Sequence, residues 1–153
     1  MPEPSPETAA RQRWMAILAR ASAAELTDLL QTAPSLPACT VLRAPESGLV
    51  MVRGRAGGGG GKFNLGEMSV TRCTVRSATG FVGHAYVQGR DQHLARLAAE
   101  LDAALQDPAL HNPLEAAVLA PLATAQRAAR AAQAARAAAT RVQFFTMATM
   151  RTS

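Results

Sequence analysis

The chain has 153 residues, 16 of them Lys or Arg against 11 Asp or Glu, which gives a net charge of +5. Hydrophobic residues make up 48% and aromatic residues only 4%, so we expect one domain over the whole chain, with much of its apolar content in alanine. No window is long and apolar enough for a membrane span and no secretion signal is recognisable, so we expect a cytoplasmic protein with Cys39 and Cys73 reduced.

Two helices are predicted near the start of the chain, after a tip at residues 1–6 that we expect to be disordered. Apolar residues recur at helical spacing from Glu7 to about Ala21, which indicates an amphipathic helix. Ser22 and Glu25 have the spacing of a capping box, in which each side chain accepts a hydrogen bond from the other's backbone N–H. This box predicts the start of a second helix.

Four short strands are predicted to follow, joined by turns into an antiparallel meander. Their β-prone runs are residues 40–44, 49–53, 67–76 and 81–88. Residues 45–48, with the sequence Pro-Glu-Ser-Gly, carry a turn signal that should fold the first two runs into a hairpin. In the third run the alternation of apolar and polar residues changes phase between Val70 and Cys73, which indicates a β-bulge or burial on both faces.

Helical signals fill the rest of the chain. Asp91 is placed to cap a helix that runs through Gln106, with leucines along its buried face. Asn112, followed by Pro and two residues later by Glu, predicts another helix start, and an alanine–arginine run continues as helix from Pro121 to Arg141. The predicted fold class is therefore α+β: N-terminal helices, a four-stranded antiparallel sheet, and C-terminal helices covering one face.

The stretch GRAGGGGGKFNLGE, residues 54–67, invites comparison with nucleotide-binding loops. A Walker A loop needs G-x-x-x-x-G-K-S/T, with the final hydroxyl on Mg²⁺. Ala56 stands at its first glycine position and Phe63 at its hydroxyl position, and Phe cannot coordinate a metal. The dinucleotide pattern G-x-G-x-x-G fits in no register across these glycines. Neither nucleotide-binding motif is therefore predicted.

Three arginines, Arg55, Arg72 and Arg90, lie in or beside predicted strands around this loop. Arginine suits phosphate and carboxylate groups because its planar guanidinium presents several donors. One interpretation is that the three side chains converge on an anion. The other is that Arg72 and Arg90 pair with Glu67 and Asp91, and both interpretations stay open.

No catalytic or metal-binding constellation is predicted. His84, His93 and His111 lack the spacing of a zinc site, and no serine lies in the context of an activated nucleophile. We therefore expect no catalytic residue, no metal ligand and no cofactor on this chain.

The C-terminal segment is predicted to be an interface. Helical geometry places its arginines largely on one face, and residues 142–153 add large apolar anchors at a chain end that would otherwise fray. The predicted interface residues are Arg127, Arg130, Arg141, Phe144, Phe145 and Met147. One alternative is that this helix packs on its own sheet. Another is that the arginines follow a nucleic acid backbone, which we do not expect because no base-reading module accompanies them.

Several short motifs, in order along the chain, resemble the PhnG family. The string R-x-G-G-x-G-x-x-F-x-x-G-E-x-x-x-T-R is preceded by R-Q-x-W-M and followed by V-Q-G-R-D and R-V-x-F-F-T-M. Their residues are Arg55, Gly57, Gly58, Gly60, Phe63, Gly66, Glu67, Thr71 and Arg72; Arg11, Gln12, Trp14 and Met15; Val87 to Asp91, with Asp102 downstream; and Arg141, Val142 and Phe144 to Met147. The resemblance extends from about Arg11 to Arg151.

The PhnG family comprises the small G subunits of the carbon–phosphorus lyase core complex of bacterial phosphonate metabolism. The resemblance implies partners of the H, I and J types, an L-type protein in the activity, and ATP and an alkylphosphonate as substrates of the complex. It implies a reaction that transfers the ribose 5-triphosphate moiety of ATP to methylphosphonate with release of adenine, in which this subunit is auxiliary. No catalytic residue carries over from the family. The alternative from composition is a basic nucleic-acid-binding module.

Overall fold

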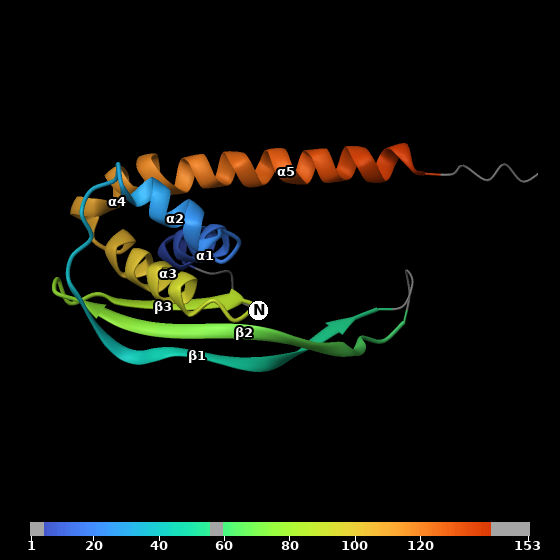
Figure 1. The fold of residues 1–153 in the computed structure, drawn as a ribbon, viewed down its shortest axis with the longest axis horizontal. Coiled ribbons are helices and arrows are strands. Elements are labelled where there is room, and N and C mark those ends of the chain that lie inside the picture. Colours follow the sequence, from blue (N-terminus) through green and yellow to red (C-terminus); the bar gives the residue numbers. More distant parts are fainter. Residues whose placement is uncertain (1–4, 56–59, 142–153) are drawn as a thin grey trace, which may run out of the picture.

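The computed structural model describes residues 5–55 and 60–141. Its elements in chain order are α1 (Pro6–Leu18), α2 (Ala23–Leu30), β1 (Cys39–Gly54), β2 (Phe63–Ser77), β3 (Val82–Gln88), α3 (Gln92–Leu105), α4 (Pro108–Leu114), the π-helical turn η1 (Glu115–Leu119) and α5 (Ala120–Ala139). The helices lie on one side of an antiparallel sheet (Figure 1). The predicted mixed α and β fold with an antiparallel sheet is therefore confirmed.

The described residues form a sheet of three strands in the order β1-β2-β3, so the prediction of four strands is wrong. Residues 45–48 make no turn, and β1 runs through them as one strand of 16 residues. Its pairing with β2 shifts register between Val41 and Arg43 and again between Arg43 and Glu46. An edge strand tolerates Pro45 at such an irregularity, because only one of its sides supplies hydrogen bonds to a neighbour.

The strand β2 is buried on both faces near its middle, which is one of the two alternatives that its apolar pattern predicts. Val70 and Thr71 are both buried, although successive side chains of a strand point to opposite faces. The pairing of β2 with β3 is regular from Val70 to Arg76. The irregularity opposite Cys73 lies in β1.

Local capping starts several helices. Ser22 and Glu25 form both bonds of the predicted capping box at α2, and Asp91 caps α3 as predicted. At α1 the cap is Ser5. Of the tip predicted to be disordered, residues 1–4 lie outside the described part of the chain, and α1 begins directly after Ser5.

The predicted helix start at Asn112 is wrong. The helix α4 begins earlier, where Pro108 takes the first helical position and the Asp107 side chain accepts from the backbone N–H of Ala109 at 2.9 Å. Pro113 lies inside this helix, and η1 joins α4 directly to α5. Asp107-Pro108 and Asn112-Pro113 carry the same local start signal, so the sequence around each pair could not decide between them.

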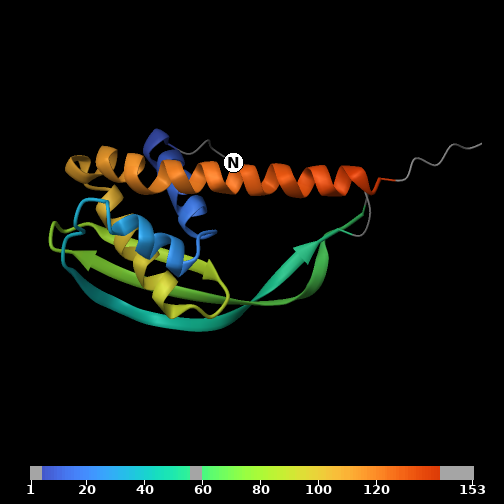
Figure 2. The ribbon, with the colours of Figure 1, turned by 45° about the horizontal axis from the view of Figure 1, so that its top comes forward.

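The helices cover the sheet in successive layers (Figures 1 and 2). The helix α3 makes the main contact with the sheet; α1 packs against α3 and reaches the edge strand β3 through Arg11, α2 packs against α3, and α5 lies outermost. The N-terminal helices thus share the covered side with the C-terminal ones. The close approach of α3 to β3 depends on Gly83, where an added Cβ would lie 2.0 Å from the backbone oxygen of Ala99.

Two elements project in the same direction beyond the packed part of the domain (Figures 1 and 2). One is the free half of α5, residues 127–139, which is exposed throughout. The other is the end of the β1-β2 hairpin, residues 49–54 and 63–69, which we call the arm. β3 ends at Gln88, opposite Val70, so the arm consists of two strands only.

Candidate functional site

A buried polar cluster forms around Asp102 of α3, between α1 and β3. The Asp102 side chain is fully buried. Its Oδ1 accepts from Trp14 Nε1 at 2.9 Å and from Arg11 Nε at 3.2 Å, and its Oδ2 accepts from Arg11 Nη2 at 2.7 Å and from the backbone N–H of His84 at 2.8 Å. These four donors replace the water that a buried carboxylate loses, and without them its burial would be strongly unfavourable.

Side chains of the same cluster form hydrogen bonds with backbone groups of β3, the edge strand beside it. Arg11 Nη2 donates to the backbone oxygen of Val82 at 3.1 Å, and Gln106 Nε2 donates to the same oxygen at 2.9 Å. Asp102 accepts a hydrogen bond from the backbone N–H of His84. This part of the edge is therefore closed to pairing with another strand.

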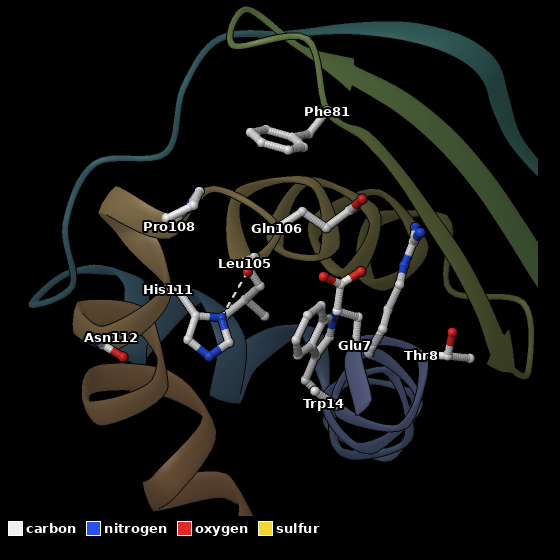
Figure 3. A pocket seen from close by; sticks show the side chains of 11 residues that line it. Glu7, Thr8, Trp14, Phe81, Leu105, Gln106, Pro108, His111 and Asn112 are labelled. Carbon is white, nitrogen blue, oxygen red and sulfur yellow. Dashed lines mark hydrogen bonds between the residues drawn. The ribbon is translucent and has the colours of Figure 1, made fainter. Parts of the chain in front are cut away.

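A pocket of about 730 Å³ opens beside the cluster, between α1, α4 and the end of α3 (Figure 3). Trp14 and Phe81 supply apolar walls, and the His111 ring packs edge-on against Trp14 with the centroids 5.4 Å apart. His111 Nδ1 lies 2.8 Å from the backbone oxygen of Leu105, to which it donates (Figure 3). Glu7 and Thr8 also line the pocket, together with Arg11, which is bound to the buried carboxylate of Asp102.

Arg72, one of three predicted anion-binding arginines, is held on the sheet by a carboxylate. Its Nε forms an ion pair with Glu46 on the neighbouring strand, and not with Glu67 as the alternative interpretation had it. The hydrogen bond from Arg72 holds the pKa of the Glu46 carboxyl below its ordinary value. Both side chains are about half exposed, so this pair contributes little to stability.

Arg55 and Arg90 lie apart from each other. Arg90 lines a small pocket of about 320 Å³ with Leu49, at the base of the arm, and forms no ion pair with Asp91 among the described residues. Arg55 follows the last residue of β1 at the far end of the arm. Strand residues rise about 3.3 Å each, so Arg55 lies roughly 20 Å from the Arg90 pocket along β1. Within this chain the three arginines therefore do not converge on one anion.

The predicted C-terminal helix is present as α5, and its arginines are exposed. Arg127 and Arg130 lie on the free half, where among the described residues they bond within the helix, to Thr124 and to the backbone of Gln126. Arg141 follows the end of α5 and so does not extend the helical stripe predicted for it. Five other predicted site residues lie outside the described part of the chain: Gly57, Gly58, Phe144, Phe145 and Met147.

The remaining chemistry of the described residues is sparse. Gly60 of the glycine loop has φ +126°, a conformation that favours glycine. No group of three His, Cys, Asp or Glu in residues 5–55 and 60–141 could hold a metal ion. Cys39 and Cys73 are both free, and burial raises the pKa of each thiol, which disfavours a reactive thiolate. Over the same residues no helix is both long and apolar enough to cross a bilayer.

The Asp102 cluster is the polar site that the sequence pattern did not predict. A carboxylate on the buried, leucine- and alanine-rich face of a helix is a signal that it needs a buried partner. Arg11, Trp14 and Asp102 all belong to the motifs that resemble PhnG proteins, but their sequence separation, 91 residues for Arg11 and Asp102, hides their contact.

The fold and these sites define a small α+β domain whose described polar residues hold the structure together and whose projecting elements present basic surface. The chain belongs to the PhnG family: the family model for the phosphonate metabolism protein PhnG matches residues 9–150. A similar protein is the alpha-D-ribose 1-methylphosphonate 5-triphosphate synthase subunit PhnG of Rhizobium meliloti (strain 1021). It is 46% identical over 139 residues, which cover 91% of this chain and 88% of the relative. The resemblance in the motifs is thereby confirmed.

Proposed function

We propose that this chain is an auxiliary subunit of a synthase that makes ribose 1-methylphosphonate 5-triphosphate in phosphonate catabolism. The observation that carries this function is the 46% identity to a subunit of that synthase, spread over 91% of the chain. The complex transfers the ribose 5-triphosphate moiety of ATP to methylphosphonate and releases adenine. This subunit works with partners of the H, I and J types and with an L-type protein, and the complex works in the cytoplasm.

The catalytic groups come from the partners in this proposal. Among the described residues Arg11, which lines the main pocket, bonds to the buried Asp102, and His111 of the same pocket bonds to the backbone oxygen of Leu105. No group of three His, Cys, Asp or Glu in this part of the chain could hold a metal ion. A side chain already saturated by structural bonds is poorly placed to exchange protons with a substrate. We therefore propose that this chain binds no cofactor of its own and supplies surface to the complex.

The main surface in this proposal is the C-terminal segment. The sequence from Ala116 to Ser153 contains no Asp or Glu, while Arg127 and Arg130 are exposed on the free half of α5. Guanidinium groups form bidentate hydrogen bonds with carboxylates, so an acidic surface on a partner suits this helix. Arg141 and the residues Phe144, Phe145 and Met147 extend the proposed interface.

The first experiment separates an auxiliary subunit from a self-sufficient enzyme. The isolated chain, incubated with ATP and methylphosphonate, should release no adenine, whereas the assembled complex should release it. Adenine release by the isolated chain at the rate of the full assembly would refute the auxiliary role. Failure of the chain to join the other subunits on co-expression would refute membership of the complex.

The second experiment locates the interface. A chain that lacks residues 142–153 should fold but lose its partners when purified through a tag. If that chain does not fold, the segment belongs to the core and the interface proposal is wrong. Alanine replacements of Arg55, Arg72 and Arg90 in the assembled complex test contact with substrate. Loss of turnover with the complex intact would assign them to substrate binding, and loss of assembly would assign them to structure.

A further inference from the structure

The arm carries an uncovered cluster of large apolar side chains. Seven large apolar side chains are exposed among the described residues, and the four that belong to the arm are Leu49, Met51, Phe63 and Leu65, with exposures of 60%, 52%, 44% and 59%. Single exposed apolar residues are ordinary on a protein surface, but a group at one projecting end indicates a binding surface.

The fold explains why no helix or third strand covers the arm. Ser47 pairs with the buried Thr71, so alternation along β1 places Leu49 and Met51 on the face of the sheet that the helices cover farther along, where Glu67 lies opposite Met51. Phe63 pairs with Gly54 and therefore lies on the other face, so both faces of the arm carry exposed apolar side chains. The third strand stops opposite Val70, before the arm begins. A two-stranded ribbon is only marginally stable in water without a third strand or a helix on its apolar face.

The charge on the arm restricts what can cover its two faces. Residues 49–54 and 63–69 contain one acidic residue, Glu67, against Arg53 within the arm and Arg55 and Lys62 beside it; these three cations are exposed and form no ion pair among the described residues. Two copies of this chain paired through their arms would bring like charges together, which is unfavourable. A surface that surrounds an apolar depression with carboxylates complements both the apolar side chains and the charge.

We infer that the arm inserts into an apolar, acid-rimmed depression on another protein subunit of the complex. This inference rests on the proposed function, because that function supplies the partner. It adds a contact surface on the side of the sheet hairpin, separate from the α5 interface. Met51 and Phe63 fill the depression, while Arg53, Arg55 and Lys62 pair with the carboxylates at its rim.

The test compares two double variants in the co-expressed complex. M51T/F63T removes two apolar side chains of the arm and keeps residues that favour strands, and L42T/Y86T removes two equally exposed apolar side chains of the sheet outside the arm. We expect the arm variant to bind its partners at least about ten-fold more weakly, because truncating a buried anchor has an effect of that order. The control variant should bind like the wild type. Circular dichroism and thermal unfolding of each isolated chain check that both variants fold.

The outcomes separate this inference from the proposed function. If the wild-type chain joins no partner, the proposed function and the inference both fail; if the wild type and the arm variant bind equally well, only the inference fails. An equal loss of partner binding in the arm variant and the control variant would also overturn the inference. If the arm variant does not fold, a photo-crosslinking residue at position 65 of the otherwise wild-type chain decides the matter. A crosslink to a partner subunit, absent with the same residue at position 42, supports the inference. A crosslink only to a second copy of this chain, or to anionic lipid vesicles, overturns it.

Discussion

Replacing Asp102 with Asn keeps the size of the side chain and removes its charge and one acceptor oxygen. The two oxygens of Asp102 accept four hydrogen bonds, two from Arg11 and one each from Trp14 and His84. An amide accepts only at its single oxygen, and its NH₂ group would face two of these donors. At least two of the four bonds are therefore lost in the Asp102→Asn variant.

The size of the effect follows from burial. A hydrogen bond to a buried charged group contributes about 1.5–3 kcal/mol. The Arg11 side chain is 32% exposed, so water replaces part of what it loses, and the lower end of that range applies to its bonds. We expect Asp102→Asn to lower the free energy of unfolding by about 3 kcal/mol. In a domain of this length such a loss lowers Tm by about 6–12 °C.

Chemical denaturation and calorimetry of the isolated chain measure this loss. Asp28→Asn is the matched control, because Asp28 is exposed on α2 and should be neutral to within about 0.5 kcal/mol. Tryptophan fluorescence adds a local readout, since the single Trp of the chain, Trp14, donates directly to Asp102. A loss below about 1 kcal/mol would refute the conclusion that Asp102 holds α1, α3 and β3 together.

Three further predictions concern stability. Gly83→Ala should destabilise the domain by about 1–3 kcal/mol or prevent folding, because the new Cβ would overlap the backbone of Ala99; unchanged denaturation would contradict the close contact of α3 with β3. Hydrogen bonds from Ser22 hold the pKa of Glu25 below its ordinary value of 4.5, so this carboxylate stabilises the fold above that pH and stops doing so as the pH falls through its lowered pKa. The loss of stability in Glu25→Ala should therefore be present near pH 7 and vanish near pH 2, and equal losses at both would refute the role. Ala132→Gly should speed hydrogen exchange in the free half of α5, where glycine costs about 1 kcal/mol, and leave the main unfolding transition unchanged.

Local sequence was sufficient for most helices because caps and apolar periodicity act over a few residues. It predicted the box at Ser22 and the cap at Asp91, and both are present. It failed at Pro45, where the turn signal is as strong as in a true hairpin. A strand continues there because β2 offers a full-length partner, and that pairing is a long-range interaction that the four residues do not encode.

The candidate site shows the same limit. The pattern of the chain indicated arginines near the glycines, but the sheet separates Arg55 from Arg90 and pairs Arg72 with Glu46. Asp102, in contrast, gave only a weak local signal. Its partners come from α1 and β3, and they meet only once α3 is packed between these two elements.

The two projecting elements together can account for a stable assembly where neither suffices alone. Fully burying a large apolar side chain contributes about 1.5–3 kcal/mol, and the four on the arm are already about half buried. Covering them therefore contributes about 4 kcal/mol in all. Association costs at least about 4 kcal/mol in lost translational and rotational freedom, so contact with the arm alone leaves almost no net affinity. The basic free half of α5 projects in the same direction as the arm (Figures 1 and 2), so one acidic partner can contact both, and the second contact adds to affinity without a second loss of freedom.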